Sequence, residues 1–301
     1  MNTYPKYTHL VLSGGGFAGL IYTGALGFIQ DHYIDKSIKH VTGVSIGAFF
    51  GFLFVLGVPM VEVDAYLRSY LVDRSNVFVE NMTLLDALSN YCIIDSDILV
   101  RPLKFFLKEH AKWTSDDITF VEFAKLTGKT FSCCASNITD FKSELFTVNT
   151  HPDVSVLTAI KASMAIPMVI PPIKINDKLY VDGFLTPLYQ DLSEQRVGES
   201  ILFLRVFLKV VNDVVDDKDK IKDVNDIPNI FNYFQMLIKT LTSHDKLKIK
   251  CDKYIPFDKC PLMSLPIEFE ENGLCIIISE EKIKESYKYG YDVMSKEFIL
   301  T

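Results

Sequence analysis

The sequence lacks several features that mark common protein classes. Its 301 residues include six cysteines, yet no two are spaced as C-x-x-C. This pattern argues against a zinc site or a disulfide framework and indicates reduced, mostly buried thiols in a reducing compartment. No cluster of Lys and Arg is present and the formal net charge is −7. We therefore expect no nucleic acid partner, no metal and no cofactor.

Targeting signals are also missing. The stretch from Met1 to His9 lacks the basic-then-apolar layout of a secretory signal, so we expect a cytoplasmic protein, at most peripheral to membranes. Residues 40–61 carry no formal charge, and this run of 22 residues is long enough to cross a bilayer. Its four glycines, its Pro59 and the lack of a basic flank on its far side favour a strand followed by a buried helix, because a helix inside a large domain is apolar all round.

What is present is ample material for a core. Hydrophobic residues make up 49% of the chain and charged residues 23%, which excludes general disorder. No internal repeat or linker divides the sequence. We therefore expect a single domain over residues 1–301, with its motifs within about 8–190 and further strands and helices over 200–301.

Short apolar strands and helices alternate at the start of the chain. Residues 8–13 predict a strand that runs into a glycine-rich loop, and residues 20–32 predict a helix. Residues 38–43 predict a second strand, followed by a helix that ends near Leu56. This alternation is typical of an α/β protein with a mainly parallel central sheet flanked by helices.

The rest of the chain continues with both kinds of element. The further predicted helices cover residues 61–67, 81–88, 96–110, 119–124, 155–165, 227–241 and 280–299. The further predicted strands cover residues 130–136, 144–148, 179–181, 200–207 and 274–278, with another that begins near Ile173. Residues 212–226 and the proline-punctuated residues 255–267 are expected to be loops.

The most informative stretch is Gly43-Val44-Ser45-Ile46-Gly47, a G-x-S-x-G pentapeptide. A serine at a sharp strand-to-helix turn has a strained backbone, and its neighbours two residues away must lack side chains to clear the strand and the helix. The turn lifts the hydroxyl to the edge of the sheet, next to a helix N-terminus. Ser45 is therefore a candidate nucleophile.

The glycine-rich loop Gly14-Gly15-Gly16-Phe17-Ala18-Gly19 has three interpretations. It matches the dinucleotide pattern G-x-G-x-x-G, but the second strand ends in Thr42-Gly43 and supplies no carboxylate to hold a ribose. It also fits an oxyanion hole, because consecutive glycines leave backbone N–H groups exposed near a helix N-terminus. The simplest alternative is a tight turn. Adjacent parallel strands would place this loop beside Ser45.

Asp182 is the second candidate. A carboxylate before a glycine is most often a turn former, and Gly183 follows it here. The apolar strand over residues 179–181 would deliver Asp182 at its carboxyl end, where parallel sheets place chemistry.

These motifs, in this order, resemble the patatin-like phospholipase family. The glycine loop, the Ser45 pentapeptide and Asp182-Gly183 look like its oxyanion loop, its nucleophile elbow and its aspartate-glycine motif. The segment Ala162-Ser163-Met164-Ala165-Ile166-Pro167 with Pro171-Pro172 also resembles the approach to that aspartate. The resemblance covers about residues 8–190 and implies a three-layer α/β/α fold.

The resemblance further implies a serine–aspartate dyad that hydrolyses acyl esters of lipids, of the phospholipase A or lysophospholipase type, at a membrane or lipid surface. Ser45 would be the nucleophile and Asp182 its base. The oxyanion hole would involve Gly14, Gly15 and Gly16, with backbone amides of the latter two as donors. The motif glycines would be Gly19, Gly43, Gly47 and Gly183. Three places depart from the family pattern: Ala18, Phe184 and Thr186-Pro187.

Two alternatives remain open from the sequence. The chain order Ser45, Asp182, His244 would also fit the triad of an ordinary α/β-hydrolase. A catalytically inactive protein that binds a lipid or a nucleotide on the same scaffold is the other. For an enzyme, apolar side chains should flank the site. Phe49, Phe52 and Phe184 are candidates, although core packing is the more common role for Phe49 and Phe52.

Overall fold

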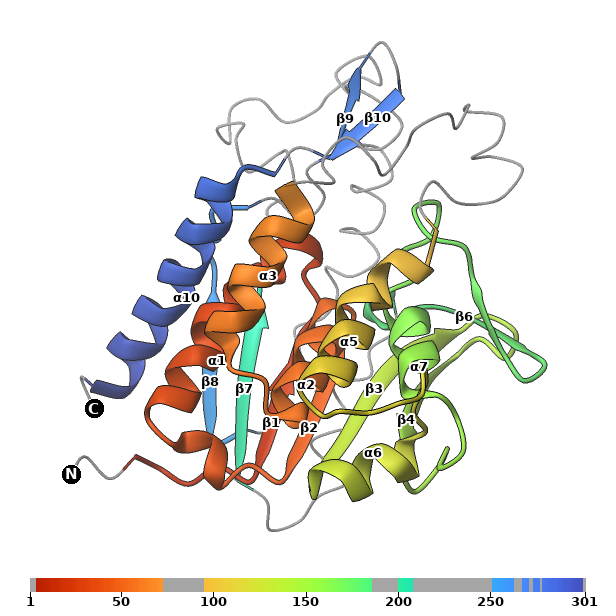
Figure 1. Cartoon of the computed structure of the whole chain (residues 1–301), viewed down its shortest axis with the longest axis horizontal. Helices are drawn as coiled ribbons and strands as arrows, with labels where there is room; N and C mark the ends of the chain where they lie inside the picture. The colour runs from red at the N-terminus through yellow and green to blue at the C-terminus, as the bar shows by residue number, and fades with distance from the viewer. Residues whose placement is uncertain are drawn as a thin grey trace.

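A computed structural model describes residues 4–72, 95–185, 200–207, 251–262, 267–270, 273–276 and 278–299. An eight-stranded sheet forms the centre of this part of the molecule, in the order β5-β6-β3-β2-β1-β7-β8, with β4 also paired to β3 (Figure 1). The predicted helices over 81–88 and 227–241, the loop over 212–226 and His244 lie outside the described residues.

The strands of the sheet are β1 (His9–Leu12), β2 (His40–Val44), β3 (Thr130–Asn137), β4 (Lys142–Thr147), β5 (Ile173–Ile175), β6 (Lys178–Asp182), β7 (Ile201–Val206) and β8 (Lys253–Phe257). A separate antiparallel pair consists of β9 (Ile267–Glu270) and β10 (Gly273–Ile276). The strands predicted from the sequence are therefore present in these regions, with shifts of a few residues at their ends.

The predicted α/β fold class is confirmed, although the sheet is mixed. β8, β7, β1, β2 and β3 run parallel to their neighbours. β4 and β6 run antiparallel to β3, and β5 antiparallel to β6. The expectation that a parallel strand delivers Asp182 is wrong. The Asn176-Asp177 turn between β5 and β6 forms a hairpin, which reverses the chain before β6 begins.

The loop predicted over 255–267 is wrong in its first three residues, which belong to β8. Pro256 lies opposite Arg205 of β7 in that strand. β8 is the outermost described strand at its side of the sheet, and an edge strand tolerates proline because one set of backbone N–H groups needs no partner strand. Proline in the sequence therefore marked an edge position and not a loop.

The described helices are α1 (Tyr22–Asp31), α2 (Ile46–Leu56), α3 (Met60–Val72), α5 (Asp97–Glu109), α6 (Phe120–Thr127), α7 (Val156–Ser163) and α10 (Glu280–Ile299). Short 3₁₀ helices are η1 (Gly16–Ile21), η2 (Ile34–Lys36) and η3 (Gly183–Leu185). α6 begins with the predicted capping box, in which Thr119 and Glu122 exchange hydrogen bonds. The helix predicted from Leu20 starts at Tyr22, because η1 leads the chain out of the glycine loop.

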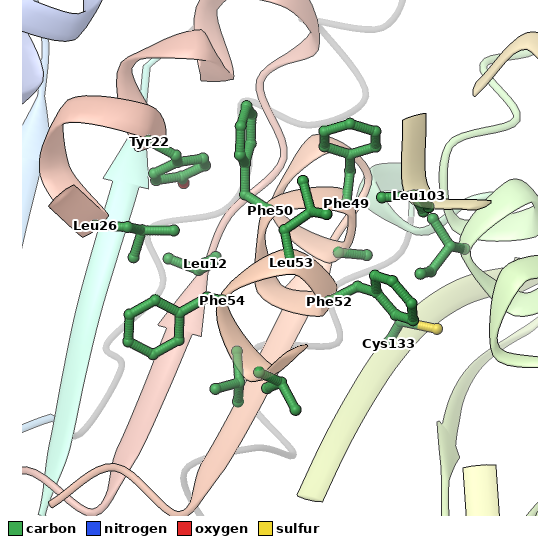
Figure 2. Close-up of a cluster of buried hydrophobic side chains, with 14 of the residues drawn as sticks. Leu12, Tyr22, Leu26, Phe49, Phe50, Phe52, Leu53, Phe54, Leu103 and Cys133 are labelled. Carbon is green, nitrogen blue, oxygen red and sulfur yellow. The ribbon is translucent and has the colours of Figure 1, made fainter. Parts of the chain in front are cut away.

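Helix α2 runs through the middle of the core (Figure 2). All of its residues from Gly47 to Leu56 are buried, and Figure 2 shows Phe49, Phe50, Phe52 and Phe54 pointing in different directions from it. This burial explains the uncharged run over residues 40–61, which is a strand, a turn and a helix inside the protein. Within the described ranges, no helix is both long and apolar enough to cross a membrane.

Both faces of the sheet are covered. Leu10 and Leu12 of β1 point into the main core with the helices, whereas Val11 belongs to a second buried cluster with Val44 and Phe203. Side chains alternate between the two faces of a strand, so the two clusters lie on opposite sides of the sheet. The three-layer arrangement requires such burial on both sides.

Candidate active site

Strands β2 and β6 approach each other end to end beside β3. β2 runs parallel to β3 and ends with Val44 opposite Cys134. β6 runs antiparallel to β3 and ends with Asp182 opposite Ala135, the next residue of β3. β4 pairs with one edge of β3, so β2 and β6 both pair with the opposite edge of β3. The carboxyl ends of the two strands therefore meet, and Ser45 follows directly after β2.

Ser45 has the strained backbone that the pentapeptide predicts. Its φ is 53° and its ψ is −126°, a backbone conformation that residues other than glycine rarely adopt. A Cβ on Gly43 would lie 2.4 Å from the carbonyl oxygen of Gly47, and one on Gly47 would lie 2.4 Å from that of Leu12. Glycine is therefore required on both sides of Ser45, since the strand and helix backbones come too close for a side chain.

Ser45 and Asp182 are in direct contact. The Ser45 hydroxyl donates a hydrogen bond of 2.6 Å to Oδ2 of Asp182, and both residues are only 4% exposed. Burial raises the pKa of Asp182 from 3.8 to about 7, while the hydrogen bonds from Ser45 and from the backbone N–H of Phe184 lower it. The carboxylate thus has a proton affinity suited to accept a proton near neutral pH.

The backbone around Asp182 holds its carboxyl group in place. The N–H of Phe184 donates to Oδ1 at 2.8 Å, which leaves Oδ2 for Ser45. The N–H of Asp182 donates to the carbonyl of Ala165, and the hydroxyl of Ser136 donates to the carbonyl of Asp182. A Cβ on Gly183 would lie 2.2 Å from the carbonyl oxygen of Cys134, so this position requires glycine. The side chain at 182 consequently has one orientation.

The glycine loop lies beside Ser45. A Cβ on Gly14 would lie 3.3 Å from Cβ of Ser45, and one on Gly19 would lie 2.3 Å from Cγ2 of Ile46. A Cβ on Gly15 would lie 2.8 Å from Val206 of β7. Gly16 has a φ of 53° and begins η1. The loop therefore packs closely between the serine turn and β7.

Ser163 is a site residue that the sequence analysis did not single out. It lies at the end of α7 and is fully buried. Its Oγ accepts a hydrogen bond of 2.9 Å from the backbone N–H of Ser45 and donates one of 2.6 Å to the carbonyl of Cys134. The only sequence signal was its place in the segment before Asp182, which gave no reason to expect contact with Ser45.

An almost wholly apolar pocket of about 120 Å³ opens at Ser45. Its volume is close to the roughly 150 Å³ of a cavity that holds one benzene ring. Helices α2, α3 and α5 and the chain after α7 form its walls. The lining residues are Gly16, Phe17, Leu20, Ser45, Ile46, Phe49, Phe50, Leu67, Tyr70, Leu71, Ile98, Leu99, Pro102, Met164, Ile166, Val169 and Ile170.

The three phenylalanines expected near the site differ in their positions. Phe49 lines the pocket, as expected. Phe52 does not, because it is fully buried and stacks on Phe123. Phe184 is half-buried, and its ring would lie 3.3 Å from a Cβ on Gly14. It therefore packs against the glycine loop.

The remaining predictions about the site concern groups outside the dyad. Ala18 is fully buried, and its carbonyl accepts a hydrogen bond from the Cys260 thiol. Thr186-Pro187 lies outside the described residues, as His244 does. The cysteines for which the structure describes a side chain, 133, 134, 251 and 260, are free thiols. In the described part of the chain, no group of three or more His, Cys, Asp or Glu residues could hold a metal ion.

Known proteins are similar to this chain in sequence. A sequence profile of the patatin-like phospholipase family matches residues 10–188. "Probable lipid hydrolase 463L" of Invertebrate iridescent virus 6 is 34% identical over 183 residues, which are 60% of this chain and 60% of that protein. "Uncharacterized protein R571" of Acanthamoeba polyphaga mimivirus is 22% identical over 299 residues, 97% of this chain and 89% of that one.

Among solved structures, VipD from Legionella pneumophila has a similar fold. The TM-score is 0.54 at 15% identity, and the similarity covers 97% of this chain and 66% of the VipD chain. The chain thus covers less than two thirds of both the iridescent virus relative and VipD. The fold and the site define an α/β protein with a serine turn and a buried carboxylate beside it. The chain belongs to the patatin-like phospholipase family, a family of lipid hydrolases.

Proposed function

We propose that this protein is a lipid acyl ester hydrolase of the phospholipase A or lysophospholipase type, with Ser45 as nucleophile and Asp182 as base. The observation that carries the proposal is the 2.6 Å hydrogen bond from the Ser45 hydroxyl to a fully buried carboxylate. A carboxylate is a weaker base than imidazole in water, but burial removes much of this disadvantage because it raises the pKa of Asp182 to about 7.

In the proposed reaction, Oγ of Ser45 attacks the ester carbonyl while its proton moves to Oδ2 of Asp182. The carbonyl oxygen gains negative charge and accepts hydrogen bonds from the backbone amides of Gly15 and Gly16, next to Gly14. Collapse of this intermediate expels the alcohol, which takes the proton from Asp182, and leaves an acyl group on Ser45. Water then attacks the acyl-enzyme while its proton moves to Asp182. The bond between the acyl group and Oγ of Ser45 breaks, Asp182 returns the proton to Oγ, and the free acid leaves.

The pocket supports an acyl substrate. Apart from Ser45 and Tyr70, none of the lining residues that the structure describes has a polar side chain. An ester with its carbonyl carbon at Ser45 could extend its hydrocarbon chain past Phe49 towards α3 and α5, where Leu67 and Leu99 lie. Burial of each methylene group contributes about 0.8 kcal/mol to binding, so such a pocket favours an acyl chain over a short polar group.

The test is labelling with a serine-reactive fluorophosphonate, read by peptide mass spectrometry. We expect an adduct on Ser45 that is absent in Ser45→Ala and at least 100-fold slower in Asp182→Asn, because general base catalysis typically contributes about 10²–10⁴-fold. Ser286→Ala is the matched control, since Ser286 is a fully buried serine in α10, away from the site. No adduct on the folded protein would contradict hydrolysis and favour a protein that only binds lipid.

A second variant separates a dyad from a triad. His244 would have to act between Ser45 and Asp182 in a triad, yet these two residues are already in direct contact. We therefore expect His244→Ala to label at the rate of the unmodified protein. A loss of labelling of 100-fold or more in this variant would assign the base to His244.

A further inference from the structure

Two hairpin turns extend beyond the edge of the sheet that holds Ser45. β3 continues for three residues past Cys134, the partner of the last residue of β2, and then turns into β4. β5 and β6 form the second hairpin, with its turn at Asn176-Asp177. We call residues 138–142 and 174–179 the hairpin tip. At about 3.3 Å per residue, Lys178 lies roughly 13 Å along β6 from Asp182.

The two turns of the hairpin tip are joined to each other. The N–H of Ile138 donates to the carbonyl of Leu179, and the N–H of Leu179 donates to the hydroxyl of Thr139, both at 2.9 Å. Nζ of Lys178 lies 2.7 Å from Asp140. The turns therefore form one unit, and they lie side by side on the right of Figure 1.

The apolar side chains of the hairpin tip are unusually exposed. Phe141 is 91% exposed, more than any other large hydrophobic residue that the structure describes. Ile138 and Leu179, joined by the backbone hydrogen bond above, are 39% and 42% exposed. Exposure of a phenylalanine and two aliphatic side chains to water is unfavourable, and transfer of these side chains to an apolar environment would remove this free-energy cost.

Charge around these side chains favours a lipid surface. Lys142, Lys174 and Lys178 outnumber Asp140 and Asp177, so the hairpin tip has a net charge of +1 in a chain of net charge −7. Lysine stems can lie along apolar groups while their ammonium ends reach lipid headgroups. A tip of two short turns with one dominant aromatic is also small for a protein interface, which typically buries about 800 Å² on each partner.

We propose that the hairpin tip is a membrane anchor: Phe141, Ile138 and Leu179 enter the headgroup region of a bilayer, and the adjacent lysines contact anionic lipids. The inference rests on the proposed lipid hydrolase function, because an anchor at this edge of the sheet brings Ser45 near a lipid surface. Only a few apolar side chains contribute, so the binding is reversible and the protein can leave the surface after turnover.

The test is co-sedimentation of the full chain with vesicles of phosphatidylcholine and phosphatidylserine. Phe141→Ala should lower the partition coefficient by roughly tenfold, the lower end expected for one phenylalanine side chain. Tyr33→Ala is the matched control. Tyr33 is also an exposed aromatic with positive φ, 58° against 54° for Phe141, but it lies before β2 at the opposite edge of the sheet. Its removal should leave partition unchanged.

A second measurement places the side chain in the bilayer directly. Both Phe141→Trp and Tyr33→Trp add tryptophan fluorescence. Brominated phosphatidylcholine should quench the fluorescence added at position 141 but not that added at position 33. Equal partition of Phe141→Ala and Tyr33→Ala, or no binding of the unmodified protein, would overturn the anchor.

The same series separates this inference from the proposed function. Vesicle partition does not require turnover, so Ser45→Ala should bind vesicles as the unmodified protein does. Hydrolysis of a soluble short-chain ester should be unchanged in Phe141→Ala, because Phe141 is not part of the catalytic site. Vesicle binding without any hydrolysis would reject the proposed enzyme and keep the anchor. Hydrolysis together with unchanged vesicle partition of Phe141→Ala would keep the enzyme and reject the anchor.

Discussion

The hydroxyl of Ser163 accepts a hydrogen bond of 2.9 Å from the backbone N–H of Ser45 and donates one to the carbonyl of Cys134. One buried side chain thereby connects the candidate nucleophile to the strand that also pairs with β6. The N–H of Ser45 itself is engaged by this contact. The proposed oxyanion donors consequently come from the glycine loop.

Ser163→Ala should slow acylation and destabilise the protein. It leaves a buried N–H and a buried carbonyl without this partner, at a cost of about 1–3 kcal/mol. As a positioning residue, Ser163 should affect kcat more than KM, and fluorophosphonate labelling should slow about tenfold or more. Ser286→Ala removes a part-buried hydrogen bond within α10, from the Ser286 hydroxyl to the carbonyl of Lys282, and should not slow labelling. Equal labelling rates in the two variants would contradict the positioning role.

The labelling rate should depend on the ionisation of Asp182. The pKa of Asp182 is raised to about 7, and only the ionised form can accept the proton of Ser45. The rate should therefore rise about tenfold per pH unit below 7 and level off above about 8. Stopped-flow or gel-based labelling across this range measures the profile. A rate independent of pH between 5 and 9 would rule out Asp182 as the base.

Asp182 should also make stability depend on pH. Its folded-state pKa is above its unfolded value, so the folded protein binds more protons between pH 3.8 and about 7, and stability falls as pH rises through this range. Asp182→Asn removes this loss and should be more stabilising at pH 8 than at pH 5, by on the order of 2–4 kcal/mol. Urea unfolding at both pH values tests this. An equal effect of Asp182→Asn at both pH values would contradict the raised pKa of Asp182.

Two glycines of α2 should respond differently to alanine. Gly47→Ala places a Cβ 2.4 Å from a backbone oxygen of β1, and the backbone cannot move aside without displacing Ser45. We expect a loss of several kcal/mol or an insoluble protein. Gly51→Ala, one turn further along, meets only side chains at 3.1 Å or more and gains helix propensity of about 1 kcal/mol. Thermal unfolding of both variants compares them, and similar melting temperatures would contradict the elbow geometry.

The pocket should determine the acyl chain length. Leu67→Trp adds volume at the wall formed by α3 and should exclude long chains, although overpacking itself costs about 1–3 kcal/mol. We expect kcat/KM for a long-chain ester to fall tenfold or more, and that for a short-chain ester to change by less than threefold. The short ester controls for general damage to the site. A parallel fall for both esters would mean that the acyl chain lies elsewhere.

Local signals in the sequence were sufficient for much of the fold. The G-x-S-x-G pentapeptide predicted the strained Ser45 turn because two backbones must cross there without side chains. Helix α10 was predicted with its observed bounds, Glu280–Ile299, since its apolar residues repeat at helical spacing. The capping box at Thr119 likewise depends only on neighbours in the chain.

The misses that affect the site concern relations between distant segments. Nothing near Asp182 reveals that β6 runs antiparallel to β3, because strand direction depends on the partner and not on the strand itself. Pro256 seemed to mark a loop until its strand was found at an edge of the sheet. Ser163 is 118 residues from Ser45, and its hydroxyl became a site residue only when the structure showed what it contacts.

The head-on meeting of β2 and β6 also has a consequence for the time at which reactivity appears during synthesis. Ser45 and Asp182 are separated by 137 residues, so a ribosome adding roughly 5–20 residues per second needs about 7–27 s between the two. If Asp182 is the base, as proposed, Ser45 has no neighbouring base until β6 has docked. On the proposed mechanism, a nascent or truncated chain would therefore be inert towards lipids.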